Sequence, residues 1–180
     1  SGMNEVLKAI CDRRSIRSYE PGQITDEQLQ ALLDAALQSP TARNTQQWHF
    51  SVVQNRALLD EFSAEDARLI GQGDNPDFHL FHGAPTVIFI SRPENCDNRF
   101  VEVDCGIAVE NIALAAQGLG LGSVILGMPM AVFCSERGAH YQKLLGFPEG
   151  YCFSIAIAVG RPAATKEAHP IGEGKINFLR

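Results

Sequence analysis

The sequence predicts an α+β fold in which helices flank a small, mixed β-sheet. Segments with helical spacing of apolar residues outnumber strand-like segments, and the two kinds do not alternate strictly along the chain. The strand-like segments are short and strongly apolar, as in a sheet covered on both faces. The chain has 180 residues, of which 45% are hydrophobic and 20% charged, enough for one packed core. We expect one domain at 3–160 and a C-terminal tail at 161–180.

The first half of the chain is expected to contain three helices and one strand. A capping box formed by Thr25 and Gln28 begins the second helix, and Asn55 is placed to cap the third. Aromatic and β-branched residues predict the strand. The expected elements are helices at 3–12, 25–39 and 55–70, and a strand at 48–54.

The second half is more apolar. A nearly continuous apolar run at 84–91 predicts a strand that is buried on both faces. The helix at 104–119 is apolar almost all round, so we expect it at the centre of the fold or between subunits. A short strand at 121–126, a helix at roughly 134–145 and a buried strand at 151–159 follow. The tail ends in the apolar segment 176–179, which predicts docking on a partner subunit.

Composition excludes several classes of protein. A net charge of −6 argues against a nucleic-acid partner, and the absence of an 18-residue apolar run argues against a membrane-spanning helix. The five cysteines have no Cys-x-x-Cys spacing, so we expect neither a disulfide framework nor a zinc site. His79 and His82 lack a nearby third ligand for a metal. We expect a cytoplasmic protein without a signal peptide.

A basic stretch at 13–19 is the most informative segment. In an extended backbone Arg13, Ser15 and Arg17 point to one side, because side chains alternate along a strand. Two guanidinium groups and a hydroxyl on one face suit a phosphate. Arginines that follow a helix also cap its last carbonyl groups, which is a purely structural alternative. Both interpretations are open from these residues alone.

The remaining motifs exclude several classes of enzyme and do not identify one. The glycines of 118–122 follow a helix and precede a strand, the reverse of a dinucleotide-binding fingerprint, so we expect a helix end and a turn there. The chain contains no serine-hydrolase elbow and no His-Glu-x-x-His motif, and no acid–base pair identifies itself. A phosphate-like site without evident catalytic side chains favours a bound cofactor that performs the chemistry.

Five segments, in order along nearly the whole chain, resemble the FMN-dependent nitroreductase family. Each motif alone is weak, but five in the family's order are specific. They are Arg-Arg-Ser-Ile-Arg-Ser-Tyr at 13–19, Ser-Pro-Thr-Ala-Arg-Asn-Thr-Gln-Gln-Trp-His-Phe at 39–50, Gly-Ala-Pro at 83–85, Asp-Cys-Gly-Ile-Ala at 104–108, and the segment 114–127.

The resemblance implies a three-layer fold, an intertwined homodimer and an FMN site. It places the ring against a backbone N–H at the end of the 121–126 strand, and one loop would come from the other subunit. The implied cofactor-binding residues are Arg13, Arg14, Ser15 and Arg17 at the phosphate and ribityl chain, Asn44 and Gln46 at the flavin or substrate, Pro40, Thr41 and Ala42 from the partner, Ile125, Leu126 and Gly127 at the ring, and Lys175 or Arg180 as a C-terminal phosphate ligand.

The resemblance further implies an oxidoreductase with ping-pong turnover. NAD(P)H would pass a hydride to flavin N5, and a nitroaromatic, a quinone or another electron-poor acceptor would then be reduced. No side chain is assigned a catalytic role. Other flavin chemistry on the same scaffold (flavin fragmentation, dehalogenation or azoline oxidation) and a non-catalytic flavin-binding module are the alternatives.

The sequence departs from the family at several places. Gln47 stands where the family usually has proline before Trp48, and Leu126 stands where some members have glutamate. The segment that often covers the active site is reduced here to about 71–82. Asn75, His79 and Phe81 are candidates to line the substrate space.

Overall fold

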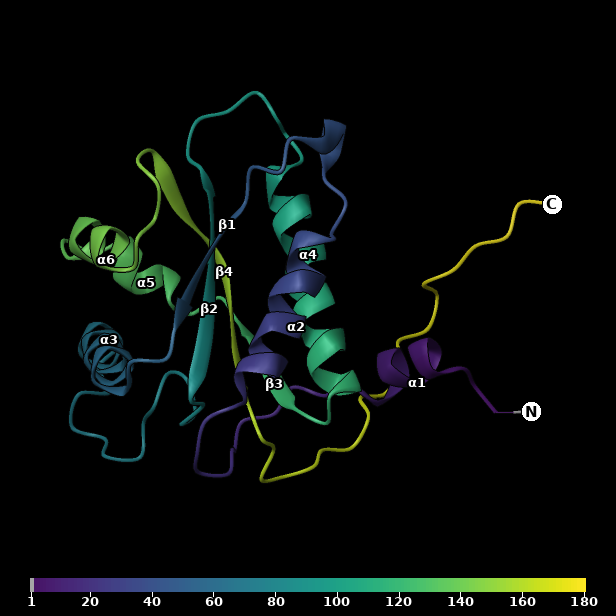
Figure 1. Cartoon of the computed structure of the whole chain (residues 1–180), viewed down its shortest axis with the longest axis horizontal. Helices are drawn as coiled ribbons and strands as arrows, with labels where there is room; N and C mark the ends of the chain where they lie inside the picture. Colours follow the sequence, from purple (N-terminus) through teal and green to yellow (C-terminus); the bar gives the residue numbers. More distant parts are fainter. Residues whose placement is uncertain (1) are drawn as a thin grey trace.

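The computed structural model describes residues 2–180 and has three layers. A four-stranded sheet separates helices α2 and α4 on one face from α3, α5 and α6 on the other (Figure 1). The predicted α+β class is therefore confirmed. The elements are α1 (Glu5–Asp12), α2 (Asp26–Leu37), a 3₁₀ turn (Ala42–Asn44), β1 (His49–Val53), α3 (Arg56–Leu69), β2 (Thr86–Pro93), α4 (Val101–Gly118), β3 (Gly122–Leu126), α5 (Met130–Phe133), α6 (Gly138–Leu144) and β4 (Tyr151–Gly160).

The sheet has the order β1-β2-β4-β3, and all neighbouring strands run antiparallel. The expectation of a mixed sheet is wrong for these four strands. The loop after α3 returns the chain to the end of the sheet where β1 stops, so Val53 pairs with Val87. Within residues 2–180, the one parallel pairing is an isolated bridge between Ser15 and Ser123.

Local signals place most helix ends. Thr25 and Gln28 form both hydrogen bonds of the capping box, and Asn55 caps α3 as predicted. The helix expected at roughly 134–145 is present as α6, but it begins only at Gly138, and a separate short helix, α5, ends just before this segment at Phe133. A Cβ atom at Gly138 would overlap the carbonyl oxygen of Phe133, so the chain turns too tightly there for one continuous helix.

Two apolar cores cover the two faces of the sheet. Phe62 of α3 is surrounded by the rings of Phe81, Phe89, Phe133 and Tyr141, with centroid distances of 5.0–5.8 Å. The other core is aliphatic and lies beneath α2 and α4. The strand β2 contributes to both cores, which confirms that it is buried on both faces. The central helix begins at Val101, three residues before the predicted start.

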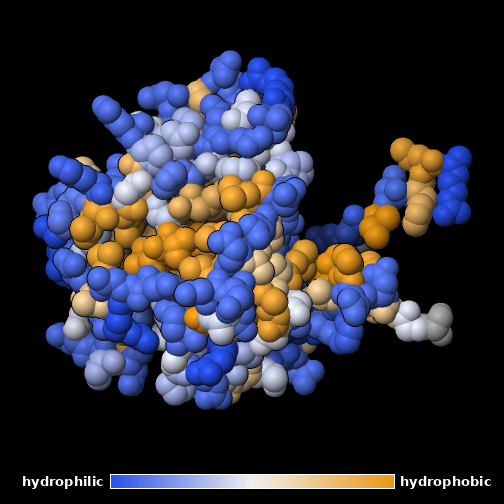
Figure 2. Space-filling model, in the orientation of Figure 1, coloured by the Kyte–Doolittle hydropathy of each residue, from blue (hydrophilic) through white to orange (hydrophobic). Residues whose placement is uncertain are grey.

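The helix α1 and the end of the C-terminal tail stand away from the body (Figures 1 and 2). No residue of α1 is buried, although Val6, Leu7 and Ile10 form an apolar face. The tail contains no helix or named strand after Gly160, and Ile176, Phe178 and Leu179 are largely exposed. Among the helices in residues 2–180, none combines the length and the apolar character that crossing a bilayer requires.

Candidate functional site

The basic stretch is extended and lies along β3. Ser15 bridges Ser123, and the N–H of Ile16 donates to the carbonyl of Ser123 at 2.8 Å. The hydroxyl of Tyr19 donates to the carbonyl of Ile16 at 2.6 Å and closes the stretch. The backbone is therefore extended, as the phosphate interpretation requires, and it directs neighbouring side chains to different sides.

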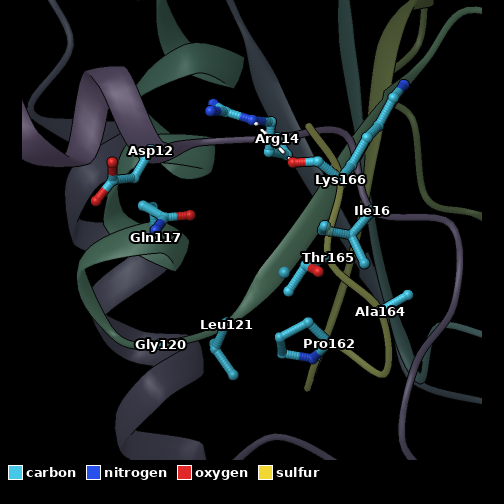
Figure 3. Close-up of a pocket in the computed structure, with 11 residues that line it drawn as sticks. Asp12, Arg14, Ile16, Gln117, Gly120, Leu121, Pro162, Ala164, Thr165 and Lys166 are labelled. Atoms are coloured by element: carbon cyan, nitrogen blue, oxygen red, sulfur yellow. Dashed lines mark hydrogen bonds between the residues drawn. The ribbon is translucent and has the colours of Figure 1, made fainter. Parts of the chain in front are cut away.

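Arg14 points to a different place from Arg13 and Arg17. Its guanidinium donates to the carbonyls of Cys11 at 2.7 Å, Arg13 at 2.8 Å and Lys166 at 3.2 Å. Figure 3 shows it with Lys166 beside a cavity of about 320 Å³ at the start of the tail. The helix-capping alternative therefore describes Arg14, whose side chain is occupied by backbone carbonyls.

Arg13, Ser15 and Arg17 keep their donor groups more available. Arg13 Nε lies 3.5 Å from Glu110 Oε1 on α4, a partly exposed pair. Among residues 2–180, no hydrogen bond or ion pair occupies the Ser15 hydroxyl or the Arg17 guanidinium. These donors suit the phosphate ester and other polar groups of one elongated anionic ligand.

A cavity of about 540 Å³ lies beside Arg17, next to the loop that precedes β2. Of the three candidates for the substrate space, Asn75 and His79 line this cavity, but Phe81 does not, because its ring is fully buried in the aromatic core. His79 Nε2 lies 3.2 Å from Asp60 Oδ1, and its Nδ1 accepts from the N–H of Phe81. Within the described part of the chain no cluster of residues could hold a metal ion.

His82 is a cavity residue that the sequence did not single out as a ligand-facing side chain. It has φ +56°, a left-handed conformation that is uncommon for residues other than glycine. Burial lowers the pKa of His82, and the positive charge of Arg17 lowers it further. The sequence signal for His82 was its position directly before Gly83 and the apolar strand. That signal was not enough, because sequence spacing does not show which side chains reach a cavity.

The loop at 40–47 is exposed but tightly ordered. Thr41 Oγ1 accepts from the N–H of Gln46 at 3.1 Å, and Gln46 Nε2 donates to Asn44 Oδ1 at 2.6 Å. The N–H of Ala42 donates to Asp104 Oδ1 on α4 at 3.1 Å. Pro40, Asn44 and Gln46 are exposed, so they are available to a ligand or a partner.

The end of β3 presents backbone rather than side chains. Leu126 is 5% exposed and packs into the aromatic core, whereas Ile125 is half-buried on the α4 side. Gly127 follows and is exposed. Leucine suits position 126 because its side chain is buried among apolar neighbours.

One chain does not bring all the predicted residues together. The loop at 40–47 is joined to Asp104 in the first turn of α4, whereas Ser15 pairs with Ser123, just after the other end of that helix (Figure 1). The 18 residues of α4 span about 27 Å. Lys175 and Arg180 lie in the exposed tail, and Arg180 stacks on Phe178 rather than approaching Arg13.

Comparison with known proteins identifies the family and its relatives. A family model described as "Nitroreductase family" matches residues 10–161. A solved nitroreductase with bound FMN from Desulfitobacterium hafniense DCB-2 is 34% identical, with a TM-score of 0.91 and coverage of 99% of this chain and 100% of that one. An Archaeoglobus fulgidus relative, provisionally named NADH dehydrogenase/NAD(P)H nitroreductase, is 37% identical over 92% of this chain and 90% of its own. A Bacillus subtilis protein named FMN reductase (NAD(P)H) is 29% identical, over 93% and 70% respectively.

Proposed function

The chain belongs to the nitroreductase family, and from that premise we propose that it is an FMN-dependent oxidoreductase that transfers electrons from NAD(P)H to an electron-poor acceptor. The observation that carries this proposal is the donor set of Arg13, Ser15 and Arg17 on the segment that pairs with β3. The similarity to a solved nitroreductase that holds FMN supports the choice of cofactor. The names of the A. fulgidus and B. subtilis relatives support NAD(P)H as the electron donor.

The residues present fit FMN. The Ser15 hydroxyl and the Arg17 guanidinium have no partner within residues 2–180, and Arg13 has only an ion pair at 3.5 Å. Such donors match a phosphate ester and the polar edge of a flavin. When bound, FMN supplies the reversible hydride chemistry that no side chain of this site provides.

The chain's own residues would bind and orient the reactants. We assign Arg13 and Ser15 to the phosphate and Arg17 to another polar group of the cofactor. Glu110 orients Arg13 through their ion pair. Ile125, Leu126 and Gly127 would form the wall beneath the ring, with Leu126 and Gly127 contributing backbone. Arg14 would contribute its backbone alone, since its side chain is bonded to three carbonyls.

We further propose that the active protein is a homodimer whose partner supplies the second half of the site. The apolar face of α1, the exposed Val103 on α4 and the apolar end of the tail all need a partner surface. The partner's loop at 40–47 would then meet the Arg13–Arg17 segment, which it cannot reach within one chain. Residues 161–166 belong with the domain, because Ala163 and Lys166 bond to Ser18 and Arg14. The remainder of the tail, with Lys175, would cross to the partner.

The acceptor is proposed to be a nitroaromatic or a quinone, and the compartment the cytoplasm. All five cysteines, which lie within residues 2–180, are free thiols, which supports a reducing compartment. The cavity beside Arg17, with its two histidines, is available to an acceptor that carries polar substituents.

The test begins with the purified protein as isolated. We expect yellow protein with flavin absorption near 450 nm, loss of that absorption on anaerobic addition of NADH or NADPH, and its return when a quinone or nitroaromatic is added. Protein that binds no FMN after reconstitution would refute the cofactor. Bound flavin that neither nucleotide reduces would refute NAD(P)H as donor.

A further inference from the structure

The loop at 41–47 has an unusually constrained backbone. Three residues that are not glycine have left-handed φ angles within four positions: Arg43 at +54°, Asn44 at +54° and Gln46 at +49°. Asparagine tolerates this region, but arginine and glutamine adopt it rarely. Such conformations persist only where the surrounding structure imposes them. All three residues are exposed, so burial of their own side chains does not impose these angles.

A buried pair of polar side chains lies under this loop. Asn98 and Asp104 are 3% and 4% exposed, and Asn98 Nδ2 lies 3.2 Å from Asp104 Oδ2. The other oxygen of Asp104 accepts from the N–H of Ala42. The Asn98 amide nitrogen also lies 3.3 Å from both Thr45 Oγ1 and Gln47 Oε1, so its two hydrogens are shared among three acceptors.

The orientation of this pair is fixed from the side of α4. Asn98 Oδ1 accepts from the N–H of Phe100 at 3.0 Å, which turns the amide nitrogen of Asn98 toward the loop. The pair therefore joins the start of α4 to three points along the loop: Ala42, Thr45 and Gln47. Because both side chains are buried, loss of either one leaves a polar group without a partner.

The backbone at Gln46 and the buried Asn98 explain why this chain has Gln47 where the family usually has proline. A proline at 47 would favour an extended backbone at Gln46, with φ near about −120°. The observed φ of Gln46 is +49°, which is far from that region. Proline would also lack the side-chain oxygen that Gln47 presents to Asn98. The departure in sequence and the buried pair therefore belong to one arrangement.

We propose that Asn98 and Asp104 are positioning residues that hold the 41–47 loop in its strained conformation before any cofactor binds. The role of the loop in cofactor binding rests on the proposed function, in which the loop presents Asn44 and Gln46 to FMN held by the other subunit. A preformed loop lowers the ordering cost of binding. Whether Asn98 and Asp104 hold the loop can be measured without FMN.

Hydrogen exchange on the FMN-free protein tests the proposal. In Asn98→Ala we expect amide exchange of Ala42 and Gln46 to accelerate at least about tenfold, with exchange in the middle of α4 and in β2 unchanged. The FMN dissociation constant of the same variant should rise about tenfold. Asn95→Ala removes an exposed asparagine three residues earlier and should change neither quantity.

A polarity swap makes the test more specific. Asn98→Asp places two carboxylates together, and Asp104→Asn places two amide donors together, so each alone should loosen the loop. The double variant restores one donor and one acceptor, since Asn at 104 can donate to Asp at 98 and still accept from Ala42. We expect Ala42 to exchange more slowly in the double variant than in either single variant, without full recovery, because aspartate at 98 no longer donates to Thr45 and Gln47.

The outcomes separate this proposal from the proposed function. Native-like loop exchange in Asn98→Ala would overturn it, as would acceleration spread equally over α4 and the sheet, or a double variant no better than the single ones. Failure of the native chain to bind FMN would refute the proposed function, while the exchange measurements would still decide whether the pair holds the loop.

Discussion

Arg13 Nε lies 3.5 Å from Glu110 Oε1, which joins the first arginine of the basic stretch to the middle of α4. Arg17 lies four residues later and has different neighbours, because it borders the cavity that His82 also lines. Four residues of extended chain span about 13 Å. The two arginines therefore have separate surroundings and would bind different parts of one elongated anionic ligand rather than the same oxygen atoms.

The double variant Arg13→Ala with Arg17→Ala should purify without flavin colour. Removal of two cationic donors takes away charge-assisted hydrogen bonds worth about 1.5–3 kcal/mol each, so FMN affinity should fall by at least about a hundredfold. The ratio of flavin absorption to protein absorption measures the effect. Arg56→Ala with Arg68→Ala removes the same charge from α3 and should remain yellow. Full colour in the first variant would rule out the phosphate assignment.

The buried carboxyl group of Asp66 should make stability depend on pH. Asp66 is fully buried on α3, and neither of its oxygens has a hydrogen-bond partner within the described chain. Burial raises its pKa from 3.8 to about 6. The folded state therefore holds a proton that the unfolded state releases, so stability falls as pH rises from about 4 through 6, by about 3 kcal/mol in total.

Asp66→Asn should remove this pH dependence and stabilise the protein at pH 8 relative to the native chain. Urea unfolding at pH 4.5 and pH 8, at fixed protein and FMN concentrations, measures it. Glu61→Gln, an exposed acid on the same helix, should leave the pH dependence in place. Equal pH dependence in the Asp66→Asn and native proteins would contradict the prediction.

Features with local causes could be predicted from the sequence. The capping box of Thr25 and Gln28 and the cap at Asn55 depend on neighbouring residues, and the structure has both. The break between α5 and α6 depends on how closely the Gly138 backbone approaches the Phe133 carbonyl five residues earlier, which residue types alone do not specify.

The residue types of the candidate site could be predicted from the sequence, but the directions in which the side chains point could not. Spacing placed Phe81 and His79 equally well near a substrate, yet packing against Phe62 buries Phe81 completely and leaves the cavity to His79 and His82. Asn98 was missed because it stands in an irregular segment without a motif. Its importance follows from left-handed angles in a loop more than 50 residues earlier, which no sequence pattern reveals.

Phe62→Ala should destabilise the fold by about 3–5 kcal/mol. The ring contacts four other aromatic rings and is 1% exposed, so its loss leaves a cavity at the centre of the aromatic core. Phe62→Leu keeps most of the volume and should lose less. Urea unfolding of both variants measures the difference, and a loss below about 1 kcal/mol for alanine would show that the core collapses around the gap.

Val103→Glu should weaken the proposed homodimer. Val103 is 57% exposed on α4 in a single chain, so a charge there is tolerated by the monomer but not in an apolar subunit interface. Light scattering with size exclusion should show monomer at low micromolar concentration, with loss of bound FMN. Leu144→Glu is the matched control, since Leu144 is 50% exposed on α6, across the sheet. A Val103→Glu protein that stays dimeric would place the interface elsewhere.

Gln47→Pro should change the backbone of Gln46 and weaken FMN binding. The proline disfavours the left-handed φ of +49° at Gln46, whose N–H bond to Thr41 Oγ1 depends on that conformation. Gln47→Ala keeps the backbone free and loses one hydrogen bond at 3.3 Å, worth about 0.5–1.5 kcal/mol. We therefore expect about a tenfold loss of FMN affinity with proline, or about 1.4 kcal/mol, and a smaller loss with alanine. Fluorescence titration with FMN measures both, and the HN–Hα coupling of Gln46 reports its φ. Proline that preserves both affinity and coupling would mean that the loop does not need glutamine at 47.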